Sequence, residues 1–348
     1  MSTMKAIVLE DLNQFSLKEV PIPRPKQGEV LIRMEAAPIN PSDIVSLKGQ
    51  YGIKKQLPFI PGLEGSGTVV ESGGGLLGWS LVGKRVACYC DKGNGTWAEY
   101  VVASAKNCVK LTAEISTEQG ACFFANPITA ICFMDIIKEQ RHQAVIQTAA
   151  ASAIGKMLLR YCMHENIPIV NIVRRQEQVE MLREIGAPYI LNSSDENFQQ
   201  ELRKLSVNLN ATVAFDCVAG EMTGTLINAM CENSVVYVYG SLSRQNIGGI
   251  DPSALIFSNK RVEGLWLQRI MKEKGSISKW NIANRVLNLL PQVLKTDISK
   301  EFELGSLNDA LEFYKKNMSS GKVLLKPKLI PSNNHVEGEG GILRLQIK

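Results

Sequence analysis

The chain has 348 residues, of which 45% are hydrophobic and 21% are charged, and its formal net charge is +5. This is the composition of an ordinary globular protein long enough for two domains. The basic residues are scattered and no apolar run approaches the ~20 residues of a membrane span, which argues against nucleic-acid binding and against a membrane protein.

The N-terminus and the cysteines bear on the cellular compartment. Residues 1–11 enter a strand-like segment directly, without the apolar core of a signal peptide or an arginine-rich transit peptide. Most of the eight cysteines lie inside apolar runs, which is typical of buried thiols in a reducing compartment. We therefore expect a cytoplasmic protein, or a mitochondrial one if a transit peptide has been removed.

Residues 1 to about 120 are predicted to be mostly β, because short strand-like segments alternate with turns rich in glycine and proline. Between them, residues 40–52 (NPSDIVSLKGQYG) predict a turn and a short helix that carries polar groups.

From about residue 120 to 290 the pattern changes to alternating strands and helices. Strands are predicted at 144–148, 169–173, 189–192, 212–218 and 234–240, and helices at 153–165, 176–185, 197–206 and 221–231. Apolar strands separated by helices indicate a parallel sheet that is covered on both faces. A last helix and strand are predicted within 306–327.

The stretch from Ala144 to Cys162 predicts the strand, tight turn and helix that open a dinucleotide-binding unit. The usual glycine fingerprint keeps only its last member, Gly155, and alanines replace the two earlier glycines. Taken alone, the pattern fits a plain buried strand–helix joint equally well.

The end of the next predicted strand indicates which cofactor is preferred. In NAD-binding units an acidic residue about 20 positions after the turn binds the ribose 2′-hydroxyl. Here that place holds Arg174 and Arg175, whose guanidinium groups suit a 2′-phosphate. The alternative, two solvated residues at a helix start, is disfavoured by the helix dipole. The pair therefore favours NADPH.

The order of parts, which ends in SSGKVLLKP (319–327), resembles the medium-chain dehydrogenase/reductase superfamily from residue 4 to about 330. The resemblance implies an α/β fold with a GroES-like β-barrel domain and a Rossmann domain with a doubly wound parallel sheet. The first would comprise residues 1–120 and 295–331, and the second residues 121–294. Residues 332–348 form a tail to which no fold is assigned.

The residues at the family's metal positions argue against zinc. Zinc-dependent members carry a Cys and a Gly-His-Glu, whereas this chain has Asn40 and Gly62-Leu63-Glu64. The cysteine-rich lobe that binds a structural zinc is also missing, and Cys88 and Cys90 are interpreted as strand residues. We expect no metal.

Among the zinc-free branches, three short motifs are most similar to mitochondrial-type trans-2-enoyl-thioester reductases. They are NPSDI…GQYG (40–52), NPITA (126–130) and GLWL (264–267). The resemblance implies NADPH-dependent reduction of an activated C=C bond, most readily that of an enoyl thioester. The alternatives are an NADPH:quinone oxidoreductase and, as a different class, a nucleotide-binding structural or regulatory subunit without turnover, which the alanine-substituted turn favours.

Tyr51 is the candidate catalytic residue. The resemblance implies that the tyrosine of the G-x-Y-G motif, residues 49–52, is the proton donor. A phenol is a weak acid and a fixed hydrogen-bond donor, as reduction of a conjugated carbonyl requires. The alternative is a tyrosine that packs at a domain edge with its hydroxyl in water.

The resemblance also implies cofactor contacts, carried over position by position. Besides the two arginines they are Asn126, Ala151, Ser152, Ala153, Ile154, Gly155, Tyr239, Gly240, Ser241, Leu242, Leu265, Trp266, Leu267 and Lys322. Residues 265–267 would form a strand. The structural alternatives are a core or dimer-interface role for Trp266, a solvated turn residue for Lys322 and a helix cap for Asn126. Ala153 and Leu265 depart from the family, which has a glycine and an aromatic residue there.

The segment 248–267 ends in a strand-like run predicted at the edge of the nucleotide-domain sheet. Because apolar edge strands are usually covered, and a two-fold partner is the commonest cover, we expect a homodimer.

Overall fold

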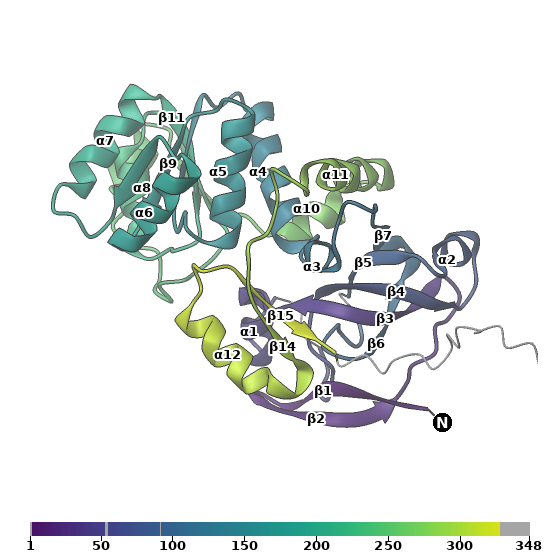
Figure 1. The fold of residues 1–348 in the computed structure, drawn as a ribbon. Coiled ribbons are helices and arrows are strands. Elements are labelled where there is room, and N and C mark those ends of the chain that lie inside the picture. The colour runs from purple at the N-terminus through teal and green to yellow at the C-terminus, as the bar shows by residue number, and fades with distance from the viewer. Residues whose placement is uncertain (1, 53–54, 91, 328–348) are drawn as a thin grey trace, which may run out of the picture.

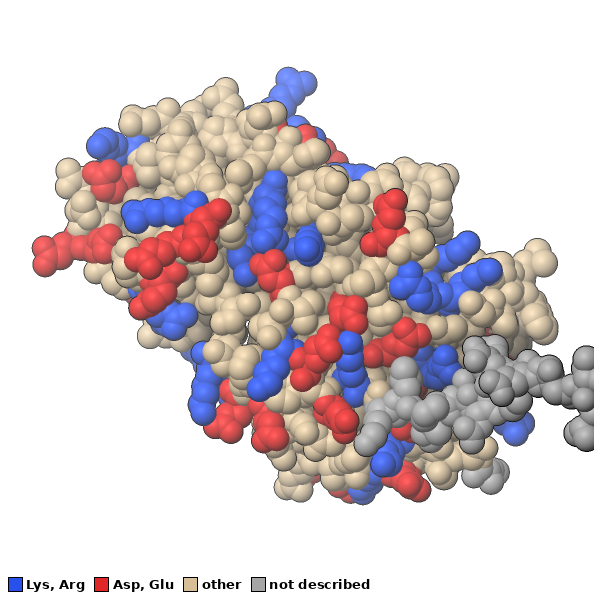
Figure 2. All heavy atoms as spheres, in the orientation of Figure 1, with Lys and Arg blue, Asp and Glu red and all other residues tan. Residues whose placement is uncertain are grey.

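A computed structural model of the chain describes residues 2–52, 55–90 and 92–327. Two lobes are joined side by side (Figure 1). The tail 332–348, and the last positions (328–331) of the predicted GroES-like domain, lie outside the described residues. Acidic and basic side chains are interspersed over the face shown in Figure 2, in keeping with the scattered charges of the sequence.

The lobe that we call the β domain contains a two-stranded and a seven-stranded sheet. The larger sheet has the order β14-β15-β3-β4-β5-β7, with β6 paired to β3. This sheet joins segments from both ends of the chain, because β15, near the C-terminus, pairs antiparallel with β3. The strands are β1 (Thr3–Asp11), β2 (Gln14–Pro21), β3 (Glu29–Pro38), β4 (Glu64–Ser72), β5 (Arg85–Tyr89), β6 (Tyr100–Ser104), β7 (Cys108–Lys110), β14 (Ile298–Glu303) and β15 (Lys322–Lys326).

The helices of the β domain are short apart from α12, which lies against β14 and β15 in Figure 1. They are α1 (Pro41–Leu47), α2 (Leu76–Leu81), α3 (Thr117–Ala121) and α12 (Leu307–Lys316), with 3₁₀ turns η1 (Ala105–Asn107) and η2 (Leu304–Ser306). The predicted turn and short helix at 40–52 is confirmed by α1, which begins with Pro41, a residue suited to the first helical position.

The other lobe, the Rossmann domain, contains a six-stranded parallel sheet in the order β10-β9-β8-β11-β12-β13. This is the order of a doubly wound dinucleotide-binding sheet. Its strands are β8 (Ala144–Gln147), β9 (Ile169–Val173), β10 (Tyr189–Asn192), β11 (Ala211–Asp216), β12 (Val235–Val238) and β13 (Arg261–Gly264). The predicted α/β class with two such domains is thus confirmed, and β13 lies at the predicted sheet edge.

Helices cover both faces of the parallel sheet. Neighbouring strand residues belong to opposite hydrophobic layers: Val145 packs in one and Ile146 in the other, as the two-residue period of a strand requires. The helices are α4 (Ala125–Glu139), α5 (Ala153–His164), α6 (Gln176–Ile185), α7 (Phe198–Asn208), α8 (Glu221–Ala229), α9 (Pro252–Ile256), α10 (Leu267–Glu273) and α11 (Ser276–Leu289). None of the helices in the described part of the chain is long and apolar enough to cross a membrane.

The predicted strands and helices between residues 144 and 240 match the observed ones to within about two residues at each end. One expected strand and one alternative are wrong, and helix α4 was missed. The strand at 265–267 is wrong, because β13 ends at Gly264 and α10 begins at Leu267. Helix α4 was not predicted, because apolar side chains on nearly all its sides hide the helical period. Asn126 is not a cap but lies inside the first turn of α4, after the N-cap Phe124.

Candidate active site between the two domains

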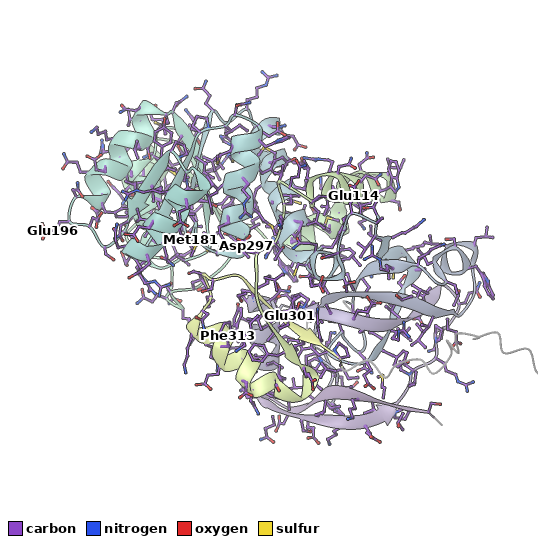
Figure 3. All side chains as sticks on the ribbon, viewed as in Figure 1. Glu114, Met181, Glu196, Asp297, Glu301 and Phe313 are labelled. Atoms are coloured by element: carbon purple, nitrogen blue, oxygen red, sulfur yellow. The ribbon has the colours of Figure 1, made fainter. Side chains whose placement is uncertain are left out.

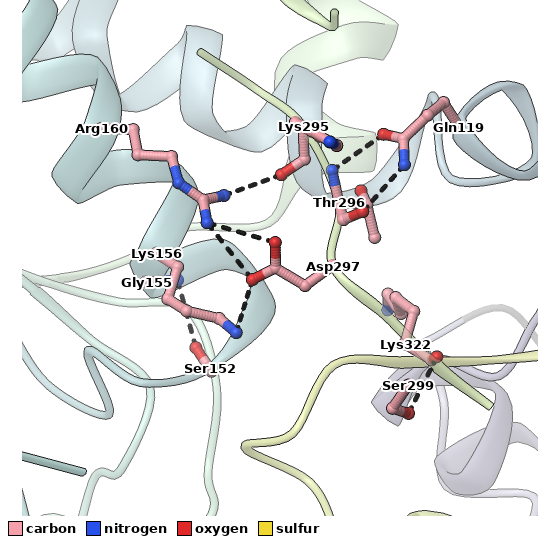
Figure 4. A network of polar contacts seen from close by, with 10 residues as sticks. All are labelled: Gln119, Ser152, Gly155, Lys156, Arg160, Lys295, Thr296, Asp297, Ser299 and Lys322. Atoms are coloured by element: carbon pink, nitrogen blue, oxygen red, sulfur yellow. Dashed lines mark hydrogen bonds and ion pairs between the residues drawn. The ribbon is translucent and has the colours of Figure 1, made fainter. Parts of the chain in front are cut away.

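The turn between β8 and α5 has the geometry of a close-packed nucleotide turn. Ala149 takes a positive φ of 46°, and Ala150 and Ala151 are buried. Gly155 is required where it stands, since a Cβ there would lie 2.5 Å from the Ala150 carbonyl oxygen. Ser152 caps α5 by accepting a hydrogen bond from the Gly155 N–H (Figure 4). The turn therefore presents backbone and a helix N-terminus, as a pyrophosphate site does.

Ala153 lies at the rim of this turn. Ala153 is the first residue of α5 and, like Ile154, is only partly buried. Its methyl group, which replaces the family's glycine, thus lies at the open end of the helix and not in the strand–helix joint that Gly155 keeps tight.

Arg174 and Arg175 lie at the end of β9, directly before α6, and both are exposed. Among the described residues neither guanidinium forms an ion pair with a carboxylate. Arg175 donates instead to Ser319 Oγ at 3.4 Å, and Gln178 donates to the same oxygen at 2.7 Å. Ser319 precedes β15, so this contact joins the Rossmann domain to the β domain. Two unneutralised cations at this place fit a bound phosphate.

The segment that leads from α11 back to the β domain is clasped by polar contacts at Asp297, which lies between the lobes (Figure 3). Asp297 accepts from buried Lys156 at 2.6 Å and from Arg160 at 3.2 Å, both on α5 (Figure 4). Burial alone would raise the pKa of Asp297, but the two cations lower it below its usual value. Beside it, Gln119 and Thr296 exchange two hydrogen bonds. This clasp ties the nucleotide turn to the second domain.

A buried polar cluster occupies the place where zinc-dependent relatives are expected to hold their metal. Asn40 donates to Glu64 Oε1 at 2.8 Å and accepts from the Lys322 ammonium group. Asp43 accepts from the Asn40 N–H at 2.8 Å. None of the four is more than 4% exposed. We define Asn40, Asp43, Glu64 and Lys322 as the buried cluster.

The buried cluster contains two carboxyl groups and one lysine. Burial raises the pKa of Asp43 to about 7, the charge of Glu64 adds to this rise, and Lys322 opposes it. Burial also raises the pKa of Glu64, although Lys322 opposes the shift. Glu64 Oε2 accepts the N–H groups of Phe124 and Ala125, which start α4. The cluster therefore holds the first turn of α4, where Asn126 lies partly buried.

The described residues contain no group of three or more His, Cys, Asp or Glu side chains able to hold a metal ion. At the family's ligand positions Asn40 donates to Glu64 and accepts from the Lys322 ammonium group, and Leu63 is buried. All eight cysteines are free thiols; Cys88 lies inside β5 as interpreted, whereas Cys90 follows the end of that strand. The donor set therefore does not fit zinc, which prefers thiolate and imidazole ligands.

Tyr51 meets the Rossmann domain. Its ring lies edge-on to Trp266, with ring centroids 6.3 Å apart, and its hydroxyl accepts from Gln268 Nε2 at 3.3 Å. The glycines of the G-x-Y-G motif make this possible. Gly49 has a positive φ of 66°, and a Cβ on Gly52 would lie 3.0 Å from the Trp266 ring. Trp266 thus packs on the motif and, at 36% exposed, is not a core residue.

The Tyr51 phenol is protonated at neutral pH. Burial raises its pKa, and the charge of Asp43 raises it further, while a polar contact with Trp266 offsets part of the shift. A raised pKa keeps the proton on the oxygen, which suits a hydrogen-bond donor more than a base. Asp43 therefore links the buried cluster to the candidate catalytic tyrosine electrostatically.

The remaining predicted residues lie in three places, which are the loop after β12, the link between β13 and α10, and the start of β15. Tyr239, Gly240, Ser241 and Leu242 form the loop after β12, as expected, with Ser241 and Leu242 exposed. Leu265 is buried between β13 and α10. Lys322 is not a solvated turn residue, because it is the first residue of β15 and is 4% exposed.

Sequence reasoning missed several residues that the structure brings to the site. They are Asp43, Tyr89, Gln268, Asp297 and Ser319. Asp43 and Ser319 lie inside sequence motifs but were assigned no role there, whereas Tyr89, Gln268 and Asp297 contact partners that are distant in the chain.

Comparison with known proteins identifies the family to which the chain belongs. Residues 26–113 match the family model "Alcohol dehydrogenase GroES-like domain", and residues 153–281 match "Zinc-binding dehydrogenase". A mitochondrial enoyl-[acyl-carrier-protein] reductase of Xenopus tropicalis is 30% identical over 80% of this chain and 81% of the relative. The chain belongs to the medium-chain dehydrogenase/reductase superfamily. The human mitochondrial enoyl-[acyl-carrier-protein] reductase is 26% identical over 89% of this chain and 84% of its own length.

Solved structures show the same fold. A Mesorhizobium loti protein, solved as a proposed NADPH:quinone reductase, has a TM-score of 0.87 and 30% identity, over 94% of this chain and 99% of the other. The quinone oxidoreductase of Thermus thermophilus has a TM-score of 0.77 at 22% identity, over 93% of this chain and all of the other. A family model named for zinc matches residues 153–281, but the positions that hold the metal in zinc-dependent relatives lie in the other domain and are occupied by Asn40 and Leu63.

Proposed function

We propose that this medium-chain reductase reduces the C=C bond of a trans-2-enoyl thioester with NADPH and without zinc. The observation that carries the proposal is the Tyr51 phenol, which lies between the two domains against Trp266 and Gln268 and keeps its proton at neutral pH. The enoyl-reductase name of the Xenopus tropicalis relative at 30% identity supports the same reaction type.

The chain is an NADPH-dependent oxidoreductase, and its own residues fit that cofactor. The tight turn at Gly155 and the capped start of α5 suit a pyrophosphate. Arg174 and Arg175, which pair with no carboxylate among the described residues, suit a 2′-phosphate. When bound, NADPH supplies the hydride. The Tyr51 hydroxyl donates to the thioester carbonyl oxygen as it gains negative charge, or protonates the adjacent carbon.

A quinone is the second candidate substrate, because the Mesorhizobium loti neighbour at 30% identity carries a quinone-reductase name. A quinone takes up hydride without needing a carbon to be protonated. A fixed phenol is therefore less important for a quinone than for an enoyl thioester.

The test is Tyr51→Phe, which keeps the ring against Trp266 and removes only the hydroxyl. On an enoyl-CoA, kcat should fall by ~10²-fold, while NADPH binding and the melting temperature stay close to those of the parent. With a quinone the loss should be smaller. A parental rate on enoyl-CoA would show that Tyr51 is structural. Absence of NADPH oxidation with either substrate would favour a nucleotide-binding subunit without turnover.

We also propose a homodimer formed at the edge strand β13. The preceding segment exposes Ile256 and Phe257, at 69% and 81% of their surface. An open strand edge beside apolar side chains is a favourable surface for a second copy. Light scattering at micromolar concentration should give twice the 38.3 kDa chain mass, and Phe257→Lys should shift it towards one chain. A parental protein of single-chain mass would contradict this proposal.

For the compartment we propose the cytoplasm or, as with the relatives named mitochondrial, the mitochondrion. The free thiols of all eight cysteines agree with a reducing environment. Cell fractionation distinguishes the two locations.

A further inference from the structure

One side chain of the Rossmann domain contacts two tyrosines of the β domain. The amide Nε2 of Gln268, in the first turn of α10, lies 3.3 Å from Tyr51 Oη and 2.5 Å from Tyr89 Oη. All three side chains are partly buried. Because 217 positions separate Gln268 from Tyr51, only the packing of the two domains brings them together.

The chemistry of the amide determines how the Tyr51 hydroxyl points. Nε2 carries two hydrogens and has no free lone pair, so it donates and does not accept. Tyr51 Oη therefore accepts from Gln268, and the single hydrogen of the Tyr51 hydroxyl is directed to a different group.

Gln268 is itself anchored. Tyr89, the last residue of β5, is the strand partner of Glu64 in the β4–β5 ladder, and its ring centroid lies 5.8 Å from that of Phe124. The Phe124 N–H donates to the buried carboxylate of Glu64. Gln268 thus contacts a tyrosine, Tyr89, whose neighbours are fixed by the buried cluster. This contact limits the motion of the Gln268 side chain.

We propose that Gln268 is a positioning residue for Tyr51: its N–H holds the phenol oxygen and turns the hydroxyl hydrogen towards the substrate oxygen. This inference rests on the proposed function, because it needs Tyr51 as the donor. A neutral amide achieves it without adding a negative charge where the substrate gains one. If Tyr51 gives its proton to the substrate, the same N–H stabilises the phenolate left behind, and solvent water returns the proton.

Two substitutions distinguish the hydrogen bonds of the Gln268 amide from the space that the side chain fills. Gln268→Leu removes both donated hydrogen bonds at similar size, and kcat on an enoyl-CoA should fall about tenfold with KM for NADPH within about twofold. Gln268→Glu should lower kcat further, because a carboxylate only accepts and would take the Tyr51 hydrogen for itself. Gln292→Leu, the same change at an exposed position, is the control and should behave like the parent.

The decisive experiment combines Gln268→Leu with Tyr51→Phe. If Gln268 acts through Tyr51, the substitution has no further effect on kcat once the hydroxyl is gone. An equal tenfold loss in both backgrounds overturns the positioning role while leaving Tyr51 as donor. So does a parental kcat for Gln268→Leu alone. A parental rate for Tyr51→Phe alone overturns the donor role and this inference with it. Should the leucine variant fail to fold, Gln268→Asn, which shortens the reach by one methylene, replaces it.

Discussion

The two main groups of charged side chains near the site differ in what surrounds them. Arg174 and Arg175 are exposed, and within the described residues they pair with no carboxylate. Lys322 is 4% exposed and lies in the buried cluster with Asn40 and Glu64. The sequence assigns the cations of both groups, the two arginines and Lys322, to the cofactor. Their environments differ, and so should the effects of removing them.

An unpaired surface cation retains its hydration and has little effect on folding, so it is available to a charged ligand. A buried lysine has lost its hydration and is tolerated only because its neighbours compensate its charge. Removing the arginine pair should therefore mainly lower the affinity for the cofactor. Removing Lys322 should mainly lower the free energy of unfolding. Three predictions test this distinction, in order of decreasing size.

Lys322→Met should destabilise the protein by about 3–5 kcal/mol, because it leaves the carboxyl groups of Asp43 and Glu64 buried without their cation. The measurement is the urea midpoint of unfolding. Lys316→Met is the matched control: that side chain is 69% exposed in an ion pair with Glu312, and its removal should cost less than about 1 kcal/mol.

Adding Glu64→Gln to Lys322→Met should recover part of the loss, since it removes a buried charge that lacks a partner. Equal midpoints for the Lys322 and Lys316 variants would mean that the buried ammonium contributes no more than a surface one. The proposed difference between the exposed arginines and the buried Lys322 would then be wrong.

Replacing Arg174 and Arg175 together with alanine should abolish most of the preference for NADPH over NADH. Charge-assisted hydrogen bonds contribute roughly 1.5–3 kcal/mol each, so the parent should bind NADPH at least about tenfold more tightly. Fluorescence titration with both cofactors measures the preference. The control is Arg183→Ala, which removes one positive charge from an exposed site in the last turn of α6. This variant should keep the preference for NADPH. Equal affinity of the parent for both cofactors would contradict the assignment.

The same contrast explains what could be predicted from the sequence. The Rossmann strands were predictable because each is a short apolar run, and the G-x-Y-G motif located Tyr51 because its glycines serve the local turn and the approach of Trp266. Arg175 was predictable because it follows the nucleotide turn at a fixed spacing. In each case the physical requirement is local in the chain.

The remaining parts of the site depend on packing between distant segments. Lys322 meets Asn40 across 282 positions, and Gln268 meets Tyr51 across 217. No periodicity or spacing encodes such a pair. Helix α4 escaped prediction for another reason: it is buried on most sides, and so its sequence lacks the polar face by which surface helices are recognised.

The smallest predicted effect concerns Asp43 and the pH dependence of stability. Burial raises the pKa of Asp43 from 3.8 to about 7. The folded state therefore holds this proton to higher pH than the unfolded chain does, so the contribution to stability is complete below pH ~3.8 and is lost as the pH rises through 7. Asp43→Asn keeps the shape and removes the titration. Between pH 5 and 8 the variant should lose less stability than the parent, by about 2–3 kcal/mol, since about two pH units of this range lie below the raised pKa and each contributes about 1.4 kcal/mol. Asp309→Asn, at an exposed position of α12, is the control and should follow the parent. Parallel curves for parent and Asp43→Asn would show that the Asp43 carboxyl is ionised throughout, with Lys322 compensating it fully.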